Sequence, residues 1–187
     1  MRTLSRLVVW GLLLAENVRS LTNWSNNLRY HNRGPVQFPT NLQELQQLIK
    51  DSGGRVRIIG TKHSFSDVAD TEGILLSLEK FKTIHVDREK MTVSIGAGVT
   101  YHELLEELKL QKLAIDNVPS LPHLSVVGSL VTGTHGGGVT KPEIAESAVE
   151  MTVVTSAGNV AVLERGRDAV FEATVHSFGL LARPQCD

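Results

Sequence analysis

A long uncharged run constrains the fold of this chain more than any other feature. From Asn117 to Gly138 the sequence contains no Asp, Glu, Lys or Arg, and Gly, Ser, Thr, Pro and His interrupt short apolar groups. A connection of this length inside a compact domain is usually functional or disordered. The apolar residues within the run would anchor it, which argues against disorder. Because glycines let a backbone approach a ligand closely, the run predicts a binding loop.

A second, shorter segment has the same character. A strand expected at 56–59 runs directly into Gly60-Thr61-Lys62-His63-Ser64. Exposed backbone N–H groups in such a loop can form a nest for a phosphate or another anion. His63 is a candidate base, metal ligand or covalent attachment point.

The surrounding pattern predicts an α+β fold. Two helices are expected to begin with capping boxes, one formed by Asn41 and Glu44 and the other by Thr100 and Glu103. A last helix is expected to begin at a cap on Asp168 and to end at 179. Strands and helices mix without a strict βαβ rhythm, which favours α+β over α/β. The expected strands are 56–59, 74–78, 83–86, 91–96 and a hairpin of 149–155 with 160–163.

Charge and cysteine content exclude several function classes. The 19 basic residues balance 20 acidic ones, with no long run of either sign, so we expect no nucleic-acid partner. The single cysteine, Cys186, rules out an intrachain disulfide and a cysteine zinc cluster. We expect no metal site, because the histidines lack the close pairing on a helix that is typical of zinc sites. The candidate ligands for this alternative are His63, Asp67, Asp70, His123 and His135.

Other nucleotide and catalytic motifs are incomplete. Gly96-Ala97-Gly98 begins like a dinucleotide-binding fingerprint, but Tyr101 stands where the third glycine belongs. The sequence also lacks a G-x-x-x-x-G-K-[ST] phosphate loop and a G-x-S-x-G nucleophile elbow.

Residues 1–20 are expected to be a leader or a weak signal peptide. Arg2 and Arg6 precede an apolar run, 7–15, that is shorter than the roughly 20 residues a membrane span needs. No A-x-A-like cleavage site follows. We therefore expect no transmembrane segment and slightly favour a cytoplasmic location, with secretion or membrane association left open. Asn23-Trp24-Ser25 is a glycosylation sequon that matters only in a secreted chain.

Together these segments resemble the bacterial-type alditol (xylitol/sorbitol) oxidases. The similarity lies in the entry at 22–25, in the loop at 57–70, and in 119–123 with 127–136. The wider group includes the gulonolactone and D-arabinono-1,4-lactone oxidases, which have the PCMH-type FAD-binding domain of the vanillyl-alcohol oxidase superfamily. The resemblance implies that residues 21–187 form two α/β subdomains with FAD between them. It also implies a flavoprotein oxidoreductase that oxidises CH–OH groups of a small polyol or sugar lactone with dioxygen.

The same resemblance implies site residues by position. His63 would carry a covalent bond from an imidazole nitrogen to the 8α-methyl carbon of the flavin. Lys62 replaces a glycine common in the family, although a cation beside a diphosphate is chemically reasonable. Ser120 would lie near the flavin ring and the substrate, and no catalytic residue is otherwise expected in this chain. The residues implied to bind FAD are Ile59, Gly60, Thr61, Lys62, His63, Ser64, Ser120, Gly128, Ser129, Thr132, Gly133, Thr134 and His135.

The resemblance further predicts a truncated chain. In the family a Gly-Val-Val strand and a substrate domain follow the helix that is expected to end at 179, whereas here the sequence continues as 180–187. We expect such a chain by itself to load FAD poorly, to expose apolar surface and a strand edge, and to have no turnover. Two alternatives stay open: a non-catalytic flavin-binding module or inactive product, and an unrelated metal- or anion-binding α+β protein.

Overall fold

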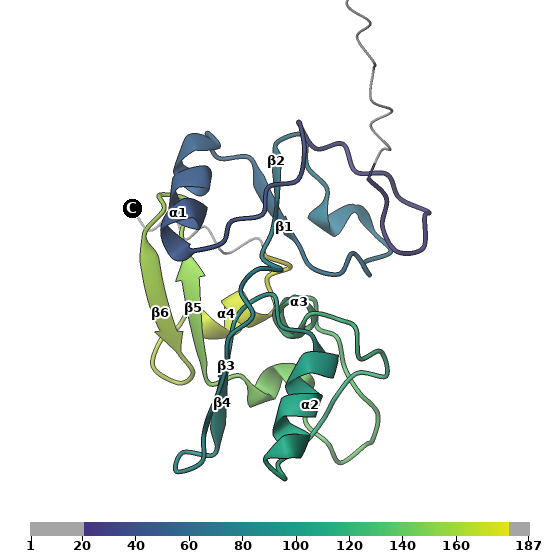
Figure 1. Ribbon diagram of the computed structural model, residues 1–187, viewed down its shortest axis with the longest axis vertical. Helices are drawn as coiled ribbons and strands as arrows, with labels where there is room; N and C mark the ends of the chain where they lie inside the picture. Colours follow the sequence, from purple (N-terminus) through teal and green to yellow (C-terminus); the bar gives the residue numbers. More distant parts are fainter. Residues whose placement is uncertain (1–20, 180–187) are drawn as a thin grey trace, which may run out of the picture.

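The computed structural model describes residues 21–179, so the expected leader at 1–20, Cys186 and the tail at 180–187 lie outside the described residues. Helices and strands mix as the α+β prediction requires (Figure 1). None of the helices between residues 21 and 179 is long and apolar enough to cross a membrane. The helices are α1 (Leu42–Asp51), α2 (Tyr101–Leu110), α3 (Val126–Val131) and α4 (Phe171–Val175), with 3-10 turns η1 (Asp67–Ala69) and η2 (Ile144–Ser147). The strands are β1 (Val56–Ile59), β2 (Ile74–Ser77), β3 (Ile84–Asp87), β4 (Thr92–Ile95), β5 (Glu150–Val154) and β6 (Val160–Glu164).

The strands pair in three two-stranded sheets within the described part of the chain. β1 and β2 are parallel, with Val56 opposite Ile74, while β3–β4 and β5–β6 are antiparallel. The expected 149–163 hairpin is therefore confirmed as β5–β6. A parallel bridge from Gln37 to Leu76 places the segment before α1 beside β2.

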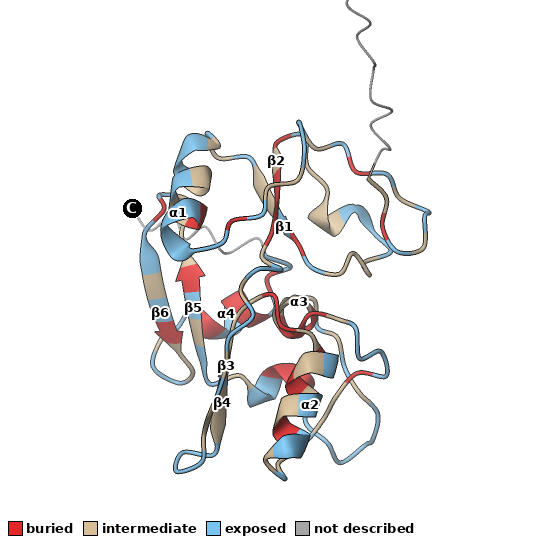
Figure 2. Ribbon diagram, viewed as in Figure 1, coloured by how far each residue is buried: buried red, intermediate tan, exposed pale blue. Residues whose placement is uncertain are grey.

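Two separate hydrophobic cores divide the molecule. The first contains Tyr30, Ile59 and Leu75 and lies around β1 and β2, in the upper part of Figures 1 and 2. The second is larger and lies around α2, α3 and the strands β3 to β6. The two cores agree with the two subdomains implied by the resemblance. Buried members of the second core include Val99, Tyr101, Leu104, Leu108, Val126, Leu130, Val153, Leu163, Phe171 and Val175.

Local capping signals position both long helices. At α1, Asn41 Oδ1 accepts the backbone N–H of Glu44 at 2.9 Å, as expected. The Glu44 carboxylate accepts the backbone N–H of Thr40 at 2.7 Å. In the usual capping box it would accept the N–H of the N-cap residue, which here is Asn41. At α2 the capping box of Thr100 and Glu103 is complete.

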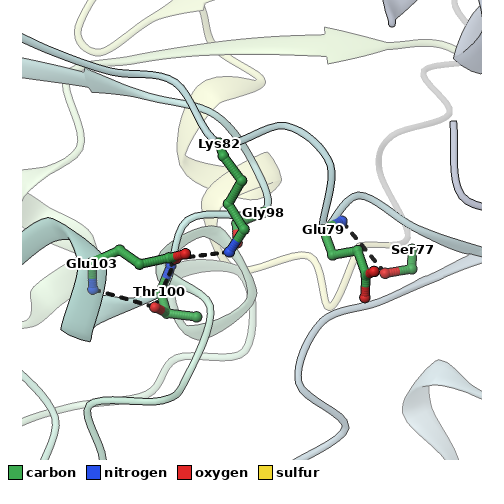
Figure 3. A network of polar contacts seen from close by, with 6 residues as sticks. All are labelled: Ser77, Glu79, Lys82, Gly98, Thr100 and Glu103. Carbon is green, nitrogen blue, oxygen red and sulfur yellow. Dashed lines mark hydrogen bonds and ion pairs between the residues drawn. The ribbon is translucent and has the colours of Figure 1, made fainter. Parts of the chain in front are cut away.

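A polar network joins the start of α2 to the connection between β2 and β3 (Figure 3). Lys82 Nζ donates to the Gly98 carbonyl at 2.6 Å and to Glu103 Oε2 at 2.7 Å. Both the backbone N–H and the hydroxyl of Thr100 donate to the same carboxylate at 2.8 Å. Burial raises the pKa of Glu103, but these hydrogen bonds outweigh it and lower the pKa to about 2.

The Gly96-Ala97-Gly98 segment, which begins like a dinucleotide fingerprint, has a packing role. The Gly98 N–H donates to the Phe81 carbonyl at 3.0 Å. A Cβ added at Gly98 would overlap the Leu78 carbonyl, and one at Gly96 would overlap the Phe81 carbonyl. Close backbone packing thus accounts for both glycines.

Two local predictions are corrected. Residues 126–131, expected as loop, form α3, because Val126 and Leu130 bury one apolar helical face in the second core. Asp168 does not cap the last helix: Val170 occupies that position, and α4 ends at Val175. Asp168 instead closes the turn after β6, where its carboxylate accepts the Glu164 N–H at 2.7 Å.

Candidate functional site

The two predicted binding loops meet where the two cores adjoin. Gly60 follows β1 in the first core, and Gly128 lies in α3 in the second. A Cβ at either glycine would overlap the hydroxyl of Ser125, the buried N-cap residue of α3. The absence of side chains at both positions therefore lets the loop after β1 lie directly against α3.

His63 lies at this junction in an aromatic cluster. The Trp24 ring stacks on the His63 ring with centroids 4.6 Å apart and planes 25° apart. The His123 ring lies 4.5 Å away at an angle of 49°, and the Nε2 atoms of the two histidines are in contact. Burial, and secondly the charge of His123, lower the pKa of His63. His63 is therefore held in the neutral form, which is the nucleophilic form of imidazole.

The backbone of the His63 loop has a defined direction. The carbonyls of Lys62 and Ser64 accept hydrogen bonds of 2.9 Å from the Trp24 backbone N–H and the Asn23 side chain. In a trans peptide the N–H points opposite to the carbonyl. The N–H groups of His63 and Phe65 therefore point away from the 23–28 turn. This arrangement is suited to an anion-binding nest.

Asn23 connects the first turn to this loop. Its side chain is only 2% exposed, and its Oδ1 accepts the Leu28 N–H at 3.1 Å. Its Nδ2 donates to Asn27 Oδ1 at 2.7 Å as well as to the Ser64 carbonyl. The sequon asparagine is thus buried and hydrogen-bonded in the folded chain, and it is not presented for glycosylation.

The second loop offers hydroxyls and open backbone. The Thr132 hydroxyl donates to the Gly128 carbonyl at 2.9 Å, and its oxygen lies 3.2 Å from that of Thr134; both residues are half-buried. No atom lies within 4 Å of a Cβ built at Gly133 or Gly137, so the backbone there is open on that side. Ser129 differs from these residues. Its hydroxyl is buried, lies 2.7 Å from the Tyr101 hydroxyl and donates to the Val126 carbonyl, so it holds α3 in place.

The remaining predicted residues differ in how far they are buried. Ser120 and His135 are exposed, whereas Ile59 is buried at the end of β1 as part of the first core. Thr61 and Ser64 are half-buried in the loop that follows. The glycine-rich segment after α3 is held close to the first part of the uncharged run, because a Cβ at Gly136 would overlap the Asn117 side chain.

Several residues that shape the site were not identified from the sequence. Asn23, Trp24 and Ser125 contact predicted site residues, and His123, identified from the sequence only as a candidate metal ligand, contacts His63. Asn23, Trp24 and His123 lie in segments that resemble the oxidase family, whereas Ser125 lies outside those segments. Trp24 and His123 are far from His63 along the chain, so no local pattern predicts the stacking.

The candidate metal ligands do not assemble into a coordination set. His63 contacts His123, while Asp70 pairs with His31 at 2.6 Å. Between residues 21 and 179, no group of three or more His, Cys, Asp or Glu side chains is placed to hold a metal ion. The polar groups of the two loops are instead backbone N–H groups, hydroxyls and the Lys62 cation. This donor set fits an anionic diphosphate such as that of FAD.

Known proteins that are similar to this chain include three oxidases. Alditol oxidase from Streptomyces sp. is 36% identical over 165 residues, which are 87% of this chain and 39% of that protein. L-gulonolactone oxidase from Scyliorhinus torazame is 33% identical over 125 residues, 65% of this chain and 28% of that protein. D-arabinono-1,4-lactone oxidase from Yarrowia lipolytica is 28% identical over 177 residues, 89% of this chain and 33% of that protein. The chain thus spans about two-fifths or less of the length of these relatives.

Solved structures support the fold. Cholesterol oxidase from B. sterolicum superposes with a TM-score of 0.72 at 19% identity, over 83% of this chain and 34% of that one. An alkyldihydroxyacetonephosphate synthase superposes with a TM-score of 0.67 at 21% identity, over 78% of this chain and 29% of that one. Residues 36–164, which include both the His63 loop and the uncharged run, match the family described as FAD binding domain. With its fold, its converging loops and this match in agreement, the chain belongs to the FAD binding domain family.

Proposed function

We propose that this chain holds the FAD of an oxidase that acts on CH–OH groups of alditols or aldonolactones with dioxygen as acceptor. The observation that carries the proposal is the meeting of the His63 loop with α3 between two separate cores. The match to the FAD binding domain and the similarity to an alditol oxidase support it. The substrate class, a small polyol or sugar lactone, comes from the names of the relatives.

Each loop has a separate part in the proposed site. The outward N–H groups of His63 and Phe65 and the Lys62 ammonium would hold diphosphate oxygens. Thr134 would donate its hydroxyl, with Thr132 beside it, and the open backbone at Gly133 would allow close approach. Ser129 contributes by holding α3. The other residues proposed to line the cofactor are Ile59, Gly60, Thr61, Ser64, Ser120, Gly128 and His135.

His63 is the proposed attachment point of the flavin. Attachment forms one bond between an imidazole nitrogen and the 8α carbon, and it breaks one N–H and one C–H bond. Two electrons and two protons leave in this exchange, and dioxygen takes them up to give hydrogen peroxide. The lowered pKa of His63 favours the step, because only the neutral imidazole has a free lone pair at neutral pH.

FAD, when bound, supplies the capacity to accept a hydride from the substrate carbon. The contribution of this chain is to bind and orient the cofactor. Ser120 lies on the exposed segment that precedes α3 and is the proposed contact to the flavin ring and the substrate.

The test is to express the chain with ample riboflavin, denature it, and record its absorbance and intact mass. We expect incomplete loading, with the loaded fraction giving a flavin spectrum that survives denaturation and a mass increase of one FAD. The His63→Ala variant should lose both signals, and His85→Ala, an exposed histidine on β3, should keep them. A bound flavin that is released on denaturation of the unaltered chain would count against His63 as the attachment point.

Turnover separates the oxidase from a non-catalytic flavin-binding module. The assay measures hydrogen peroxide with alditols and aldonolactones as substrates. Peroxide formation that depends on these substrates supports the oxidase, whereas stable FAD without turnover indicates the module.

A further inference from the structure

The His63 ring is held from two directions by residues of different segments. Trp24, from the first turn, stacks on its face, and His123, from the uncharged run, contacts its Nε2 edge. His123 belongs to the segment that leads into α3 on the second core, whereas His63 follows β1 on the first. The contact therefore joins the two halves of the molecule at the proposed attachment residue.

The Nε2-to-Nε2 contact restricts the protons on both rings. Two N–H groups facing each other would repel, and two bare lone pairs would repel equally. One nitrogen must donate and the other accept, so a single proton lies between them. If His63 donates this proton, its own lone pair is on Nδ1, the nitrogen that does not face His123.

We propose that His123 is a positioning residue for His63. It accepts the Nε2–H of His63 and so selects the tautomer whose Nδ1 is nucleophilic. It then takes that proton as the bond to the flavin methyl carbon forms at Nδ1. This inference rests on the proposed function, because it assigns a role in the attachment step described above.

The balance of the step is unchanged by this role. The N–C bond forms at Nδ1 while one C–H bond of the methyl group breaks, and its two electrons and its proton pass to dioxygen. The second proton is the Nε2–H of His63, which His123 receives and releases to solvent. His123 is exposed, so this release is open to water.

The groups that face His63 make His123 the natural acceptor. Trp24 offers only an N–H donor, and Lys62, adjacent in the chain, carries an ammonium group that has donors and no acceptor. His123 is the charged neighbour that affects the pKa of His63, in addition to burial. A neutral imidazole has one nitrogen with a free lone pair, so His123 can accept the Nε2–H of His63.

The first test measures the rate of covalent FAD incorporation into the apo form of the chain, by intact mass over time. His123→Ala should slow attachment by about 100-fold, the lower end of what a positioned base contributes. Non-covalent FAD affinity, from flavin fluorescence, should change by less than about threefold, since His123 is not among the residues proposed to bind FAD. His85→Ala is the matched control and should attach FAD at the original rate.

His123→Gln separates orientation from proton transfer. The Gln carbonyl can accept the Nε2–H of His63 and keep its tautomer, but it cannot take the proton. We expect a rate between those of the unaltered chain and His123→Ala, and added imidazole should raise the rate of His123→Ala only. An unchanged rate in His123→Ala would overturn the inference. Absence of any FAD binding by the unaltered chain would instead overturn the proposed function, and the inference with it.

A second test needs no flavin. The histidine resonances of the apo chain are followed against pH by NMR. A pair that shares one proton titrates in two separated steps, so His63 should show two inflections, and His123→Ala should leave one. Simple, independent titration of both rings in the unaltered chain would contradict the shared proton.

Discussion

Lys62 has a φ of 61°, a left-handed conformation that L-residues with a side chain adopt at a cost of about 1–2 kcal/mol. Glycine would remove this cost but would be more flexible in the unfolded chain. We therefore expect Lys62→Gly to raise the free energy of unfolding by about 0.5–1 kcal/mol in urea denaturation. If the Lys62 ammonium binds the diphosphate, the same variant should bind FAD more weakly, and this weakening should diminish at high salt.

Lys112 provides a matched comparison for Lys62. It has a φ of 58° just after α2 and lies outside the proposed cofactor site. Lys112→Gly should therefore give a similar gain in stability with unchanged FAD affinity. Equal affinities in both glycine variants would show that the Lys62 charge has no part in binding.

Asn23 is a buried residue whose hydrogen bonds hold the His63 loop. Asn23→Ala would leave the Leu28 N–H and the Ser64 carbonyl without this partner. Because an unpaired buried polar group costs about 1–3 kcal/mol, we expect a loss of about 2–3 kcal/mol in the free energy of unfolding. Asn32→Ala, which removes a local hydrogen bond to the Gly34 carbonyl, should cost less than about 1 kcal/mol. Similar losses in the two variants would contradict the special role of Asn23.

At the scale of elements, the start of α2 depends on one carboxylate. The pKa of Glu103 is about 2 in the folded chain against an ordinary value of 4.5, so the ionised form is favoured by folding. Its contribution is fully present above pH 4.5 and is lost as the pH falls toward 2. Because Lys82 and Glu103 are both about 40% exposed, solvent screening limits this contribution to about 1 kcal/mol.

Glu103→Gln tests this dependence. We expect the variant to be less stable than the unaltered chain at pH 7, with the difference shrinking steadily as the pH falls below 4.5, measured by urea unfolding at several pH values. Glu106→Gln, on the same helix but outside the network of Figure 3, should show little pH-dependent difference. A constant difference for Glu103→Gln across this pH range would mean that the charge is not responsible.

At the scale of the whole molecule, Ser125 sets how closely the two halves approach. Gly60→Ala would place a methyl group against the Ser125 hydroxyl, and such overpacking costs about 1–3 kcal/mol. The Ser125 Cβ is 3.5 Å from the same added atom, which is an ordinary contact distance. Ser125→Ala should therefore relieve most of the cost of Gly60→Ala.

A double-mutant cycle measures this relief. We expect the cost of Gly60→Ala in the Ser125→Ala background to fall by about 1 kcal/mol or more, a coupling typical of residues in contact. Gly137→Ala, where an added Cβ meets nothing within 4 Å, is the control and should not couple to Ser125. Additive effects of Gly60→Ala and Ser125→Ala would show that the loop and α3 are not packed as described.

Local sequence signals predicted most of the elements. The capping residues Asn41 and Thr100 and the alternation in the 149–163 hairpin act over a few neighbouring residues, so they are readable without the fold. α3 was missed because its six residues contain Gly128 and Ser129 and no charged residue. Its helical state depends on burying Val126 and Leu130 in a core to which distant segments contribute.

By itself the sequence determined the α+β class. It also identified the His63 loop and the uncharged run as candidate binding loops that resemble a flavin oxidase family. These features depend on residue type and on spacing along the chain. Only the tertiary structure decided that Trp24 and His123 flank His63, that Asn23 is buried, and that the Ser129 hydroxyl is turned into the core. These contacts join residues that are far apart in sequence, and the contact of His63 with His123 also joins the two halves of the molecule. Their geometry follows from tertiary packing, which no local pattern encodes.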